Sequence, residues 1–123
     1  MATITTKLTV TGSAADYGAA LALSVSDNLQ VTAPSKGISR FDLAVGGNSV
    51  LLAAGDAGTT FLYVKNNNTT GSGSIQIETA GGTDYGTIEN GEWGWIPIDT
   101  AVGCRLTGAG AIVEVEYAFW SRT

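Results

Sequence analysis

Residues 113–120 read VEVEYAFW, a segment in which apolar and polar side chains alternate almost one by one. A period of two places successive side chains on opposite faces of a β-strand. One face carries Val113, Val115, Tyr117 and Phe119. The other face carries Glu114, Glu116, Ala118 and Trp120. The segment therefore predicts a strand with one buried face and one outward face.

Shorter segments with the same period recur along the 123 residues, separated by turn signals rich in Gly, Asp, Asn and Ser. We count roughly eight to ten short strands, a number typical of β-sandwiches and jelly rolls. The apolar share of 44% and the 17 glycines suit short strands joined by tight turns. The sequence therefore predicts an all-β, single-domain antiparallel β-sandwich of the jelly-roll type over residues 1–123.

The N-terminal third predicts several short strands. Residues 4–10 alternate, and residues 1–12 are interpreted as an arm that contacts neighbouring molecules. Residues 20–26 predict a second strand, although alanine and leucine in 14–23 also allow a helix. Asp27 and Asn28 predict a turn, after which a third strand ends before Pro34. A further turn at residues 35–37 precedes a strand over 38–45.

Residues 61–98 predict a run of hairpins that forms the central sheet. Residues 61–65 carry apolar side chains on both faces, which favours a central strand. Pro97 favours an edge position or a bulge for the last strand of this region. The tight step at residues 90–91 sets the register that places Trp93 and Trp95 on one face.

The residue inventory excludes the common catalytic chemistries. The chain has no histidine and a single cysteine, Cys104, so Ser-His-Asp, Cys-His and Cys/His zinc sites cannot be assembled. Glu114 and Glu116 form the one close carboxylate pair on a strand, which a glycosidase could use, but a solvated strand face is the simpler interpretation. The sequence predicts a protein that is not an enzyme and that needs no cofactor or metal.

Charge and hydropathy limit the partners. The net charge of −5 comes from residues scattered along the chain, so neither a nucleic-acid footprint nor an anionic membrane surface is expected. The longest apolar run, residues 50–54, is far too short to cross a bilayer. The first residues lack the apolar core of a signal peptide, which predicts assembly in a cytoplasm.

Aromatic side chains supply most of the candidate contact residues. Trp93 and Trp95 present two indoles on one face, which suits a core, a protein interface or a platform for sugar rings. Trp120 lies on the polar side of its strand and is a candidate interface anchor. Lys7 in the N-terminal arm and Tyr17 in the following loop complete the interface candidates.

Three segments together resemble small β-rich virion proteins of tailed bacteriophages, especially those of marine and cyanobacterial phages. They are LYVKN at 62–66, NGEWGWIP at 90–97 and VEVEYAFW at 113–120. The resemblance implies a structural role in the particle, as a capsid decoration (cement) protein or a component of the neck, tail or fibre. It implies the major capsid protein or other virion subunits as partners, and a homo-oligomer, with a trimer favoured. The alternative is a carbohydrate- or receptor-binding module that uses Trp93 and Trp95.

Overall fold

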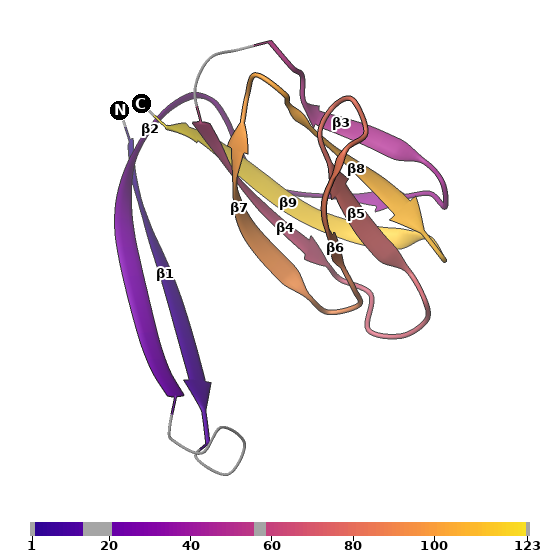
Figure 1. Ribbon diagram of the computed structural model, residues 1–123, viewed down its shortest axis with the longest axis horizontal. Helices are drawn as coiled ribbons and strands as arrows, with labels where there is room; N and C mark the ends of the chain where they lie inside the picture. Colours follow the sequence, from indigo (N-terminus) through magenta and orange to yellow (C-terminus); the bar gives the residue numbers. More distant parts are fainter. Residues whose placement is uncertain (1, 14–20, 56–58, 123) are drawn as a thin grey trace.

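The computed structural model describes residues 2–13, 21–55 and 59–122, and these residues form nine β-strands and no helix (Figure 1). The strands are β1 (Ala2–Gly12), β2 (Leu21–Leu43), β3 (Asn48–Leu52), β4 (Thr59–Asn66), β5 (Ser74–Glu78), β6 (Asp84–Ile88), β7 (Trp93–Asp99), β8 (Cys104–Ala109) and β9 (Val113–Arg122). The all-β prediction is confirmed. Residues 14–20 of the competing helix lie outside the described residues, and 21–23 are strand. The described segments contain no helix that is long and apolar enough to span a membrane.

The strands form two antiparallel sheets packed as a β-sandwich, as predicted. One sheet has the order β1-β2-β9-β4-β7, and the other has the order β3-β8-β5-β6. β4 lies between β9 and β7, which confirms that it is a central strand. β7 pairs only with β4 in the described structure, so Pro97 lies on an edge strand as predicted, where its missing N–H costs no ladder bond.

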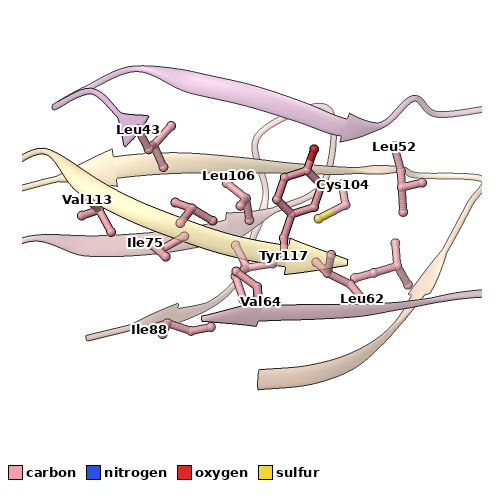
Figure 2. Packing of buried hydrophobic residues seen from close by; sticks show 13 residues of the cluster. Leu43, Leu52, Leu62, Val64, Ile75, Ile88, Cys104, Leu106, Val113 and Tyr117 are labelled. Carbon is pink, nitrogen blue, oxygen red and sulfur yellow. The ribbon is translucent and has the colours of Figure 1, made fainter. Parts of the chain in front are cut away.

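The core lies between the inner faces of the two sheets (Figure 2). The large sheet contributes Leu43, Leu62, Val64, Ile98, Val113, Val115 and Tyr117. The small sheet contributes Leu52, Ile75, Ile77, Ile88, Cys104 and Leu106. Full burial of one such aliphatic side chain stabilises the fold by about 1.5–3 kcal/mol. Residues 113–119 therefore form a strand with one face against the core, as their alternation predicts.

The predicted turn at Asp27 and Asn28 is wrong, because β2 passes through both residues as one 23-residue strand. Their backbones continue in register opposite Thr6 and Thr5 of β1. The Thr5 hydroxyl donates to Asn28 Oδ1 at 2.7 Å, so the side chain that suggested a turn bonds across the strand pair. The predicted breaks at Pro34 and at residues 35–37 are also wrong, since the chain shows register shifts there between β2 and β9 without leaving the sheet.

The prediction that residues 61–98 form one central sheet of hairpins is wrong. β4 and β7 belong to the five-stranded sheet, whereas β5 and β6 belong to the four-stranded sheet. The chain crosses between the layers after β4 and again before β7. With this division, β4 and β7 face the core from one sheet, and β5 and β6 face it from the other.

β1 and the first half of β2 form a two-stranded ribbon, here called the arm (residues 2–12 and 21–31). Figure 1 shows the arm projecting away from the body of the sandwich. It starts near the C-terminal end of β9, since Val31 is paired with Arg122. Within the segment expected to be an arm, residues 2–12 thus form β1, which is paired along its whole length with residues 21–31 of β2, and β2 leads into the sandwich.

Candidate functional site

The outer face of the five-stranded sheet carries the tryptophan residues. In β7, Gly94, Ile96 and Ile98 turn toward the core, so Trp93 and Trp95 share the opposite face, as predicted. The turn before β7 fixes this register: Glu92 N–H donates to the Glu89 carbonyl at 3.1 Å, and Gly91 takes a φ of 76°. Trp93 is 55% exposed, and neither indole belongs to the core cluster. Trp93 and Trp95 therefore do not form part of the core, and both lie on the outer face of the sheet.

Three aromatic rings form a row across β4, β7 and β9. The ring centroids of Phe61 and Trp95 lie 5.7 Å apart in a stacked arrangement. Trp95 and Trp120 lie 5.4 Å apart with tilted rings. The structure thus brings together two of the predicted interface residues, Trp95 and Trp120, on opposite sides of β4. Because Trp95 packs on two neighbouring rings, Trp93 offers the more open indole of the pair.

A cleft of about 530 Å³ separates the arm from the aromatic face. The arm lines it with Thr6, Lys7, Leu8, Val25 and Asp27, and the sandwich lines it with Tyr63, Trp93, Gly94 and Trp95. Lys7, Trp93 and Trp95 are thus gathered in one place, whereas Tyr17 lies outside the described residues. Sequence reasoning missed Tyr63, Val25 and Asp27 as neighbours of the tryptophans. Alternation marked the faces of Tyr63 and Val25, whereas Asp27 was expected in a turn, and nothing local showed that the arm would face β7.

The apolar face of the arm is buried at its base and exposed farther out. At the base, Leu29 and Val31 are 3% and 5% exposed. Farther along, the cross-strand pairs Leu8–Val25 and Val10–Leu23 have exposed fractions of 44%, 53%, 36% and 45%, in that order. A contiguous exposed apolar surface of this kind is typical of an interaction site.

Beside the aromatic row, Glu116 joins β2, β4 and β9 through its carboxylate. Arg40 Nε donates to Glu116 Oε2 at 2.8 Å, and the Tyr63 hydroxyl donates to Glu116 Oε1 at 2.9 Å. The Arg40 guanidinium, followed by Tyr63, holds the pKa of Glu116 below its usual value of 4.5. Burial, followed by the bond to Glu116, raises the pKa of Tyr63 to about 12. Glu116 is therefore engaged as a structural ion pair and is not half of a free carboxylate pair with Glu114.

Replacing Glu116 by Gln is expected to lower Tm by at most about 5 °C at pH 7, because exposed ion pairs stabilise little. The lowered pKa of Glu116 means that its contribution is present above pH 4.5 and is lost as the pH falls through the folded-state pKa. Thermal unfolding between pH 3 and pH 7 should therefore show the two proteins converging in acid. Glu114→Gln, an exposed neighbour on the same strand, is the control, and an equal effect there would contradict the specific role of Glu116.

Cys104 is fully buried in the core, and burial raises the pKa of its thiol to about 12. A thiol that stays protonated at neutral pH is a poor nucleophile. Within the described segments, no group of three or more His, Cys, Asp or Glu side chains is arranged to hold a metal ion. The distinctive surface of this part of the molecule is the arm, the cleft and the aromatic row.

No protein-family model matches the sequence, and no curated protein matches it. Among solved structures, a chain from a study titled "Bacillus endospore appendages form a novel family of disulfide-linked pili" aligns with a TM-score of 0.40 and 17% identity. The alignment covers 79% of this chain and 100% of that chain. Similarity at this level assigns neither a fold family nor a function.

Proposed function

We propose that this protein is a non-enzymatic structural subunit of a tailed-phage virion, most specifically a capsid decoration (cement) protein. The observation that carries the proposal is the projecting arm, whose exposed apolar face stands beside the aromatic cleft. Such a surface suits repeated contacts with neighbouring subunits of a lattice, including the major capsid protein. The segments that resemble phage virion proteins supply the assignment to a virion.

A decoration protein of this kind works by multivalency. Each copy makes a few modest contacts, and the gain accumulates because neighbouring copies are held at high effective concentration. The rigid sandwich suits such a role because it holds the arm and the aromatic row on one scaffold. A closed homo-oligomer, with a trimer favoured, would present several arms at once, in a virion assembled in the host cytoplasm.

Gold-labelled antibodies raised against the pure protein should bind particles purified from infected source cells. We expect label distributed evenly over the capsid surface, because a decoration protein occupies every equivalent lattice position. Label confined to a tail, ring or spike would overturn the decoration role, and particles without label would overturn the virion assignment. Pre-immune antibodies on the same particles serve as the control for nonspecific labelling.

The cleft favours one second candidate, a carbohydrate-binding module of a tail or fibre. Its volume lies within the range of about 300–1,000 Å³ that small-molecule sites occupy, and it is lined by Trp93 and Tyr63 together with polar Lys7 and Asp27. Glycan-array binding that is lost in Trp93→Ala, with folding intact, would place this function ahead of decoration.

A further inference from the structure

The outer edge of β1 is a long unpaired strand edge. β1 pairs with β2 in one unbroken register from Ala2 opposite Val31 to Gly12 opposite Leu21. No other described strand pairs with β1, so its other edge presents backbone N–H and C=O groups without ladder partners. A regular edge of eleven residues is a template for another strand.

The other edges of the two sheets carry features that discourage such pairing. β7 contains Pro97 and ends in Asp99. β3 and β6 are five residues long, and each has a register shift with its neighbour. The opposite edge of the arm, residues 21–30, carries Asp27 and Asn28, which disfavour added strands. β1 has no proline, acidic residue or register shift, and Lys7 is its one charge, so it is the least protected edge in the described structure.

The arm is also incomplete as a folding unit. A two-stranded ribbon is marginally stable in water, and at least three strands with a covered apolar face are normally needed. The exposed pairs Leu8–Val25 and Val10–Leu23 show that the outer half of the arm lacks such cover. A partner that adds strands and apolar surface at β1 would satisfy both requirements.

We propose that β1 pairs with β1 of a second copy of this chain, antiparallel across a two-fold axis at Thr6. The two arms then form one continuous four-stranded sheet, whose apolar face lies toward the aromatic clefts. This contact deepens the proposed assembly role, on which it rests, by naming the surface that joins two copies. The β1 contact joins one closed oligomer to another. The contacts within each oligomer are made by surfaces of the sandwich.

The sequence of β1 is self-complementary in this register. Cross-strand partners point to the same face, so Leu8 lies opposite Ile4 of the second copy, and apolar side chains meet apolar ones. Lys7 lies opposite Thr5 of the second copy, whereas an axis at Lys7 would place two ammonium groups directly opposite each other. Thr3 lies opposite Thr9 of the second copy, and Thr6 lies opposite Thr6, which are favourable cross-strand combinations. These matches favour a second copy over a strand of unrelated sequence.

Cysteine cross-linking tests the register in the full-length protein. Cross-strand Cβ atoms about 4.5–5.5 Å apart allow a disulfide after small adjustment, so Thr6→Cys should give mostly disulfide-linked dimers under mild oxidation. In Thr9→Cys the two cysteines would lie about 20 Å apart, so no disulfide-linked dimer should form. Mixing Thr3→Cys with Thr9→Cys should restore cross-linking, because these positions face each other. The buried Cys104 leaves the unsubstituted protein as a silent control.

Light scattering supplies the equilibrium test. Leu8→Lys is expected to weaken association at least about tenfold and to halve the particle mass at suitable concentrations. Val50→Lys on β3, where the valine is 54% exposed, is the matched control and should leave the mass unchanged. Near-ultraviolet circular dichroism checks that both variants keep the native tryptophan environment.

The outcomes separate this contact from the proposed function. A lack of cross-linking in Thr6→Cys, or equal cross-linking in Thr9→Cys, overturns the β1 contact even if the capsid is labelled. Register-specific cross-linking supports the contact even if no particle is labelled, in which case the virion role alone fails. Dimers that are insensitive to Leu8→Lys would place the interface on the sandwich and also overturn the contact.

Discussion

Gly103→Ala is expected to lower the free energy of unfolding by about 2–5 kcal/mol, with a fall in Tm of roughly 10–20 °C. Gly103 ends the turn that leads into β8 and has a φ of +67°, a conformation that L side chains rarely adopt. A Cβ there would lie 2.5 Å from the Leu52 carbonyl oxygen and 2.8 Å from the Ala54 nitrogen. Both neighbours are backbone atoms, so the clash cannot be relieved by a side-chain rotation, and the β3–β4 connection must move.

Substitutions at two other glycines separate the effect of the positive φ from the effect of the steric clash. Gly46 has a φ of +68° but nothing within 4 Å of its Cβ position, so Gly46→Ala measures the backbone strain alone, about 1–2 kcal/mol. Gly86 is also open and has no positive φ, so Gly86→Ala should be near neutral or slightly stabilising. Chemical unfolding of the three variants provides the comparison. Equal losses for Gly103→Ala and Gly46→Ala would show that the backbone contact at Gly103 does not constrain the fold.

The parts of the fold that depend on one strand and its two faces could be predicted from the sequence. Alternation in residues 113–119 identified the buried face of β9, and two-sided apolar character identified β4 as a central strand. Pro97 identified an edge, because a proline there removes no ladder bond. In each case the residues that carry the pattern belong to the strand whose position the pattern predicts.

The errors arose where a distant strand decides the outcome. Asp27 and Asn28 favour turns locally, but β1 pairs with this segment in unbroken register, and the Thr5 hydroxyl donates to Asn28 Oδ1 across the strand pair. Likewise, the alternation within β5 and β6 is the same whether these strands stay in the sheet of β4 or cross to the other sheet. The choice depends on which arrangement buries more apolar surface, a property of the whole chain.

The candidate site was only partly visible for the same reason. Spacing placed Trp93 and Trp95 on one face, but it did not reveal whether that face was inside or outside. The contact between Trp95 and Trp120 depends on β4 lying between β7 and β9. The cleft depends on the direction in which the arm leaves the sandwich, next to the register shifts between β2 and β9, and no local residue pattern predicts that direction.

The second large effect is expected at Asn66, a fully buried polar residue at the end of β4. Its backbone N–H donates to the Glu92 carbonyl at 3.0 Å, and its carbonyl accepts from Gly91 N–H at 3.1 Å. Its side-chain Nδ2 donates to the Gly73 carbonyl at 3.0 Å, and Oδ1 accepts from Asn68 N–H at 3.0 Å. One residue thus ties the crossover into β5 and the turn into β7 to the same point of the sandwich.

Asn66→Ala should therefore cost about 2–5 kcal/mol, because it leaves the Gly73 carbonyl and the Asn68 N–H without these partners and opens a small cavity. Urea unfolding should show a lower midpoint with an unchanged m-value, whereas the exposed Asn48→Ala should stay within about 0.5 kcal/mol of the parent protein. Asn66 Nδ2 also donates to Asn90 Oδ1, in the turn that begins β7, at 3.4 Å. Because this bond is lost as well, the near-ultraviolet signal of Trp93 and Trp95 should also change in the folded variant. A loss below 1 kcal/mol, with an unaltered tryptophan signal, would mean that the crossovers are positioned by core packing and do not depend on this hydrogen-bonded corner.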